Sequence, residues 1–160
     1  MEGKRVNESS VIMAQMMNPQ DANPAGNVHG GVVVRTIDEA AAVVAARHSR
    51  GNVVTASIDR LNFHNPVFVG DVLFFKASLN FVGRSSMEIG VRVEAENLIT
   101  GVVRHAATAY LTYVALDPNG KPREAPPLIL ETEEERRRNS EARRRREVRL
   151  AEKKRETGDG

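Results

Sequence analysis

Four stretches in the second half of the folded part alternate apolar and polar residues with a period of two. They cover residues 53–63, 72–82, 86–97 and 102–116. In the second stretch one face carries Leu73, Phe75, Ala77, Leu79 and Phe81, and in the third Met87, Ile89, Val91, Val93 and Ala95 oppose Glu88, Arg92, Glu94 and Glu96. This period is typical of half-buried strands. Because the links are short and rich in turn residues, we expect four strands that follow one another as antiparallel neighbours.

A helical period marks residues 30–48. Val33, Ile37, Ala40 or Ala41, and Val44 form one apolar stripe there. Gly51 is expected to be its C-cap, and residues 9–17 predict a first strand whose pairing the pattern leaves open. A helix this apolar needs cover on most sides, and a curved antiparallel sheet wrapped around it supplies that cover. The expected fold class is therefore α+β, with a long central helix and a wrapping sheet.

The chain divides by composition into three parts. Residues 1–8 are polar and expected to be flexible, residues 9–127 form the predicted domain, and residues 128–160 form a charged helix or tail. Pairs such as Glu133 with Arg137, Glu134 with Arg138 and Glu141 with Arg145 stand at i,i+4. The segment has no apolar stripe, so we expect a solvated helix. Two interpretations stay open: it reaches along a neighbouring subunit, or it has no partner.

Composition excludes several classes of function. The chain has 160 residues and no cysteine, which rules out disulfides and thiolate-zinc sites. No apolar run could span a bilayer and no signal peptide is evident, so we expect a cytoplasmic protein without a membrane span. Residues 131–156 hold eleven Lys and Arg against eight Glu. Apart from these residues and Asp159, the rest of the chain holds 12 basic and 12 acidic residues. Because this rest of the chain is neutral and only 4% of all residues are aromatic, we expect no nucleic-acid partner.

Residues 26–31, Gly-Asn-Val-His-Gly-Gly, stand where the predicted helix begins. Gly30 and Gly31 carry no Cβ, so a ligand can approach their backbone N–H groups closely. The helix N-terminus points those N–H groups and its positive dipole end outward. This arrangement suits a developing oxyanion, and the Asn27 amide stands beside it.

Asp38 follows Gly31 by seven residues, which places it on nearly the same side of the helix and roughly 10 Å along the axis. It therefore cannot reach a carbonyl held at that N-terminus in the same chain. A second copy running antiparallel could supply its own Asp38, and small residues on that side would permit the approach: Gly31, Ala41, Ala42 and Ala45. We therefore expect a two-fold dimer with two shared sites. The alternative is that Asp38 is a solvated residue of an amphipathic helix.

Taken together, several short motifs resemble the hot-dog acyl-CoA thioesterases, above all the brain-type and short-chain bacterial branches of the acyl-CoA hydrolases. The motifs are residues 26–31, 37–40 (Ile-Asp-Glu-Ala), 46–48 (Ala-Arg-His), Phe63 with Pro66 and Val67, and Gly70 with Asp71. The similarity covers roughly residues 9–135. It implies the hot-dog fold and hydrolysis of acyl-CoA to free acid and CoA without a metal or cofactor. It also implies paired subunits, often as trimers of dimers.

The resemblance assigns catalysis to Asn27 and Asp38 from opposite subunits, with Asp38 as general base or as nucleophile. It places the pantetheine arm along Val54, Thr55, Ala56 and Ser57, held through their backbone. Arg84, Ser85 and Ser86 form a tight turn that could bind a phosphate of CoA. An ordinary hairpin turn explains the same three residues equally well.

Other chemistry is less well supported. No pair of the four histidines has metal-ligand spacing. We interpret His48 as a favourable charge at the helix C-terminus. Asp71 is expected in a turn and Asp59 at an exposed strand position. Two alternative functions remain: a hot-dog enoyl-CoA hydratase, and a non-catalytic acyl-CoA sensor that uses the basic tail.

Overall fold

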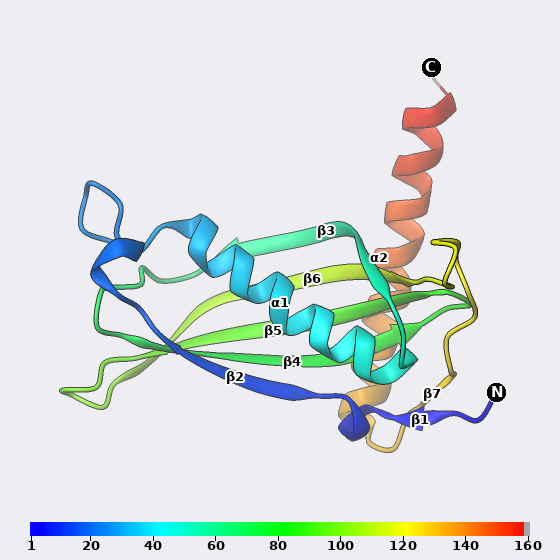
Figure 1. The fold of residues 1–160 in the computed structure, drawn as a ribbon, viewed down its shortest axis with the longest axis horizontal. Coiled ribbons are helices and arrows are strands. Elements are labelled where there is room, and N and C mark those ends of the chain that lie inside the picture. Colours follow the sequence, from blue (N-terminus) through cyan, green and yellow to red (C-terminus); the bar gives the residue numbers. More distant parts are fainter. Residues whose placement is uncertain (159–160) are drawn as a thin grey trace.

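A five-stranded antiparallel sheet with a helix on each face makes up most of the computed structural model, which describes residues 1–158 (Figure 1). In chain order the elements are β1 (Lys4–Arg5), the 3-10 turn η1 (Val6–Glu8), β2 (Val11–Met16), η2 (Pro19–Asp21), α1 (Gly30–Ser49), β3 (Val53–Phe63), β4 (Val72–Val82), β5 (Ser86–Glu96), β6 (Val103–Ala115), β7 (Leu128–Ile129) and α2 (Glu133–Gly158). We call the face that α1 covers the inner face and the opposite one the outer face. The predicted fold class is confirmed.

The strand order β2-β4-β5-β6-β3 corrects one prediction. Only β4, β5 and β6 form a meander, because β3 pairs with β6 and not with the strand that follows it. The eight residues between β3 and β4 cross the end of the sheet and bury Val67, whose carbonyl accepts a hydrogen bond from Val28 N at 2.8 Å. β2, left unplaced by its sequence, occupies the other edge beside β4.

Helix α1 packs one side against the inner face of the sheet (Figure 1). The predicted stripe is confirmed, since Val33, Ile37, Ala40 and Val44 are buried. Ala41 and Ala45 are also fully buried there. They therefore do not lie beside Asp38 on the open side of the helix, where the expected approach of a second copy would need small residues. The opposite side, with Arg35, Glu39 and Val43, is exposed, so the sheet covers the helix on one side and not on most sides.

The helix ends at Arg50 and not at the predicted cap Gly51. Arg50 adopts the left-handed conformation (φ 52°, ψ 49°), and its N–H donates to Ala46 O at 2.7 Å. Glycine is needed at position 51 for a different reason: a side chain there would collide with the guanidinium of Arg123. That guanidinium donates to Ser49 O at 2.8 Å and so satisfies a carbonyl of the last turn.

A bulge in β4 moves Phe81 off the face that strict alternation predicts. Leu79 pairs with Ile89 but Phe81 pairs with Glu88, so Asn80 is an extra residue in the strand. Phe81 consequently lies on the outer face, where Arg143 and Arg146 of α2 stand over its ring at 5.1 and 5.6 Å.

Helix α2 crosses the outer face and runs past β3 (Figure 1). The predicted helix is present, and Arg138 pairs with Glu134 at 2.7 Å as expected. It is not simply solvated, however. Arg145 bonds Glu88 of β5 instead of the predicted Glu141, and Arg137 pairs with Glu141 and Glu134. Residues 159–160 of the expected tail lie outside the described part of the chain.

The first residues of the chain also take part in the fold. Within the segment expected to be flexible, β1 pairs in parallel with β7, and Val6 is buried. Lys4 Nζ donates to His48 O at 2.8 Å and so caps α1 with a cation. Over residues 1–158, no helix is both long and apolar enough to cross a membrane.

His48 is fully buried at the end of α1, and its Nε2–H donates to Pro126 O at 2.6 Å. Burial lowers the pKa of His48, which outweighs the raising effect of that hydrogen bond. The ring is therefore a neutral core residue, and the predicted charge–dipole role is wrong. Lys4 supplies the cation at this position instead.

We predict that the free energy of unfolding falls as the pH drops below about 6.5, the usual pKa of histidine. In that range the unfolded chain binds a proton at His48 and the folded chain does not. Stability is therefore lost until the pH reaches the pKa of His48 in the folded protein. If folding lowers the pKa of His48 by one, the free energy of unfolding falls by about 1.4 kcal/mol over this pH range. His48→Gln should flatten this dependence in urea titrations between pH 8 and 5.

His105 is the matched control, because burial lowers its pKa as well. His105→Gln should remove only its own share of the slope. A His48→Gln profile parallel to wild type would contradict the assignment.

Candidate active site

The N-terminal end of α1 borders a pocket of about 390 Å³. Its lining residues come from the turn before α1, from α1 itself, and from the end of β3 with the loop that follows: Asn23, Asn27, Val28, Gly30, Val33, Phe63, His64, Asn65, Pro66 and Val67. Asn27 is held through its backbone, which donates to Asn23 Oδ1 at 3.2 Å and bridges to Phe68. The backbone of this residue is therefore held in place at the border of the pocket.

The two glycines leave open space at the first turn of α1. A Cβ on Gly30 would lie 3.5 Å from Phe63 Cζ, an ordinary contact, and one on Gly31 would meet nothing within 4 Å. Packing within one chain therefore does not require glycine at either position. His29 occupies the N-cap position without a side-chain capping bond, so the first backbone N–H groups of the helix are free to meet a ligand.

Asp38 lies in the middle of α1, where two strands of the inner face hold its carboxylate. Thr55 Oγ1 of β3 donates to Asp38 Oδ1 at 2.9 Å. The Tyr113 hydroxyl of β6 contacts the same oxygen at short range and lies 2.8 Å from Asp38 O. Thr55 and Tyr113 face each other in the β3–β6 register. Asp38 is consequently a positioned carboxylate and not a freely solvated one.

Nothing in the sequence pattern indicates a role for Tyr113. It falls on the apolar side of an alternating strand and is 1% exposed, so it looks like an ordinary core residue. Burial raises the pKa of Tyr113 well above its usual value, and the hydrogen bond to Asp38 raises it further. The hydroxyl therefore keeps its proton and remains a donor to the carboxylate.

Within one chain the pocket and the carboxylate are separate. Asp38, Thr55 and Tyr113 are not among the residues that line the pocket at Asn27. Eight residues of helix from Gly30 to Asp38 correspond to about 12 Å. The structure therefore agrees with the expectation that Asn27 and Asp38 of one chain do not share a site.

The segments predicted to bind CoA lie at the same end of the sheet, on either side of β6. Val54 and Ser86 both pair with Val114 of β6, so the start of β3 lies near the turn that holds Arg84 and Ser85. Arg84 is exposed. Within β3, Val54, Thr55 and Ala56 are exposed along a strand that has a neighbour on one side only.

The other polar candidates have structural partners. Asp71 accepts from Phe68 N and pairs with Arg104 at 2.7 Å, as a buried turn residue. Asp59 is not exposed, contrary to our expectation, because Arg149 of α2 pairs with it at 3.3 Å. The rings of His64 and His105 lie 4.4 Å apart. Among residues 1–158, no group of three or more acidic or histidine side chains is placed to hold a metal ion.

The fold, with a pocket at the start of α1 and a positioned carboxylate in the middle of this helix, is that of a hot-dog protein of the thioesterase class. Residues 25–102 match the Thioesterase superfamily. The uncharacterized acyl-CoA thioester hydrolase YkhA of Bacillus subtilis is 42% identical over 79% of this chain and 73% of its own length. The chain belongs to this family of acyl-CoA thioester hydrolases.

The mouse cytosolic acyl coenzyme A thioester hydrolase is 40% identical over 82% of this chain, which spans only 35% of that longer protein. A hexameric acyl-CoA thioesterase superposes with a TM-score of 0.91 at 39% identity, covering 95% of this chain and 97% of that one. The acyl-CoA hydrolase of Staphylococcus aureus, solved with butyryl-CoA and CoA, has a TM-score of 0.90 at 35% identity over 98% and 95% of the two chains. Its solved variants replace one aspartate, one asparagine and one threonine by alanine.

Proposed function

We propose that this protein hydrolyses acyl-CoA thioesters to a free carboxylic acid and CoA. The observation that carries the proposal is the carboxylate of Asp38, held by Thr55 and Tyr113 on a helix whose N-terminus borders an open pocket. Support comes from the family and from the structural similarity to an enzyme that binds butyryl-CoA. The three residue types varied in that enzyme are those of Asp38, Asn27 and Thr55.

In this mechanism the thioester carbonyl lies at the first turn of α1, where the N–H groups near Gly30 and Gly31 stabilise the oxyanion. The partner's Asp38 takes a proton from water, and the resulting hydroxide forms a bond to the carbonyl carbon. The C–S bond then breaks, and the thiolate of CoA receives the proton. In the nucleophilic alternative, a carboxylate oxygen of Asp38 bonds to the carbonyl carbon, the C–S bond breaks, and CoA leaves as a thiolate. Water then opens the resulting anhydride, which releases the free acid and restores the Asp38 carboxylate, and the remaining proton goes to the thiolate. Asn27 orients the carbonyl or the water in both alternatives.

The proposal needs two copies of the chain, because Asp38 lies outside the pocket that Asn27 borders. The part of the exposed edge of β3 that follows Ser57 is the natural pairing surface, since Ile58 and Phe63 remain 43% and 50% exposed along it. A two-fold dimer formed there would contain two equivalent sites. The hexameric assembly of a similar thioesterase supports a trimer of such dimers.

We also propose how the rest of the substrate binds. The pantetheine arm lies along Val54, Thr55, Ala56 and Ser57 and bonds their free backbone groups. Arg84, with Ser85 and Ser86, binds a phosphate of CoA. Water is the only co-reactant, and in this proposal Asp38 and Asn27 act on it without a metal or cofactor. The cytosolic relatives support action in the cytoplasm.

Mixing two inactive variants tests the shared site. Asp38→Asn and Asn27→Ala should each lose most thioesterase activity, measured as thiol release from butyryl-CoA. Co-expressed in equal amounts, they form dimers in which one of four sites is intact when pairing is random, so about a quarter of the wild-type activity should return. A single-chain site would leave the mixture as inactive as its components, and full activity of folded Asp38→Asn would overturn the function.

Tyr113→Phe removes the hydroxyl that holds Asp38 and keeps the ring. Because hydrogen bonds to charged groups contribute about 1.5–3 kcal/mol, we expect kcat to fall by tenfold or more. Tyr110→Phe is the matched control, since Tyr110 is the other tyrosine of β6 and its ring lies beneath Arg145 on the outer face. Equal kcat values in the two variants would remove Tyr113 from the site.

Arg84→Ala should raise KM for acyl-CoA by about tenfold, because one charge-assisted bond to phosphate is lost, and should change kcat little. Arg136→Ala, which removes an exposed arginine of α2, supplies the comparison at equal net charge. The same KM in both variants would show that residues 83–86 are only a hairpin turn.

A further inference from the structure

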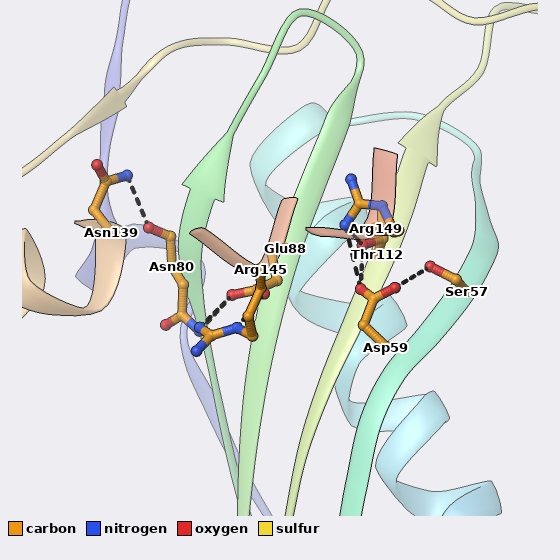
Figure 2. A network of polar contacts seen from close by, with 8 residues as sticks. All are labelled: Ser57, Asp59, Asn80, Glu88, Thr112, Asn139, Arg145 and Arg149. Atoms are coloured by element: carbon orange, nitrogen blue, oxygen red, sulfur yellow. Dashed lines mark hydrogen bonds and ion pairs between the residues drawn. The ribbon is translucent and has the colours of Figure 1, made fainter. Parts of the chain in front are cut away.

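The outer face of the sheet carries a buried network of polar and charged side chains that hydrolysis does not use (Figure 2). In its first half, Arg145 of α2 donates to both carboxylate oxygens of Glu88, at 2.8 and 3.0 Å. Asn80, the bulged residue of β4, donates to Glu88 at 3.0 Å and accepts from Asn139 of α2 at the same distance. This half joins α2 to the centre of the sheet.

The second half of the network joins α2 to β3. Asp59 accepts from Ser57 Oγ and from Thr112 Oγ1, both at 2.6 Å. Arg149 of α2 pairs with Asp59 at 3.3 Å and donates to Thr112 Oγ1 at 2.7 Å (Figure 2). One guanidinium thus contacts side chains of two adjacent strands, β3 and β6.

These contacts, and not apolar packing, attach the helix. α2 buries only Asn139 and Ala142. The paired carboxylates are nearly inaccessible, with side-chain exposures of 4% for Glu88 and 9% for Asp59. Buried charges are costly to desolvate and are tolerated when they are paired and hydrogen-bonded. Loss of Arg149 would leave Asp59 without its cation.

The network contacts β3 where its register is irregular. The pairing with β6 shifts between Thr55 and Ser57 and again between Ile58 and Arg60, so Ala56 and Asp59 are extra residues. In a regular strand, Thr55 and Ser57 would share a face. Here Thr55 contacts Asp38 on the inner face, whereas Ser57 bonds Asp59 on the outer face. The bulge at Ala56 therefore separates two residues that must point in opposite directions.

We propose that Arg149 is a positioning residue for the reaction, because it holds the bulged segment of β3 in the register that brings Thr55 to Asp38. β3 has no neighbour on its other side within the chain, so α2 is its support on the outer face. The C-terminal helix thereby takes part in catalysis without contacting substrate. This inference rests on the proposed function.

A double-mutant cycle tests it on the full-length oligomer. Arg149→Met should lower kcat for butyryl-CoA by about tenfold, since a small displacement of a catalytic group has effects of this size. Arg149→Lys should recover part of the loss, because an ammonium can contact Asp59 or Thr112. In a Thr55→Ala background, Arg149→Met should cause no further loss, since both changes remove the same contact.

Arg144→Met is the matched control, because Arg144 is an exposed arginine of the same helix. Size-exclusion chromatography and circular dichroism should show the same assembly and helix content in all variants. Where Arg149→Met fails to fold, Thr112→Val takes its place in the cycle, because it removes the bridging hydroxyl with little change of volume.

The positioning role would be overturned by a kcat of Arg149→Met equal to that of Arg144→Met, or by losses that multiply independently with Thr55→Ala. A wild-type rate in Thr55→Ala would overturn it as well. Failure of the proposed function has a different signature, which is a wild-type rate in Asp38→Asn.

Discussion

The packing of the α1 stripe against the inner face of the sheet determines the rest of the candidate site. Because Ile37 and Ala41 are buried, the intervening Asp38 emerges at the edge of the contact, within reach of Thr55 and Tyr113. A rotation of the helix by one residue, about 100°, would remove the carboxylate from both hydroxyls. The same packing sets the first turn of the helix against Phe63, at the mouth of the pocket. One apolar contact thus orients both the carboxylate of Asp38 and the first turn of the helix.

Hydrophobic periodicity was sufficient to predict the long helix and the extents of the four long strands, because it reports which side of each element is buried. Asp38 became a candidate on other grounds, namely its helical spacing from Gly31 and the resemblance to the hot-dog thioesterases. Periodicity could not predict Tyr113, whose contact with Asp38 depends on β6, and not β4, lying next to β3. Strand order arises from long-range packing, and the alternation within a strand does not encode it.

Bulges and buried ion pairs account for most of the remaining differences. A single extra residue, Asn80, moved Phe81 to the opposite face from the one its pattern predicts. The arginines of α2 were expected to pair with glutamates four positions away, because local spacing is visible in a sequence. Arg145 instead bonds Glu88, which lies 57 residues earlier in the chain, and Arg149 bonds Asp59, which lies 90 residues earlier. The charge pattern correctly indicated a helix but gave no sign of what that helix contacts.

The open edge of β3 has a consequence for the life of a newly made subunit. A single chain presents eleven residues of strand with unpaired backbone groups and with apolar side chains such as Ile58 and Phe63 exposed. Such an edge pairs as readily with an incorrect strand as with a correct one and is a template for aggregation. The bulges and the twist they impose discourage mispairing. Rapid pairing of this edge after synthesis would therefore limit the aggregation of newly made chains.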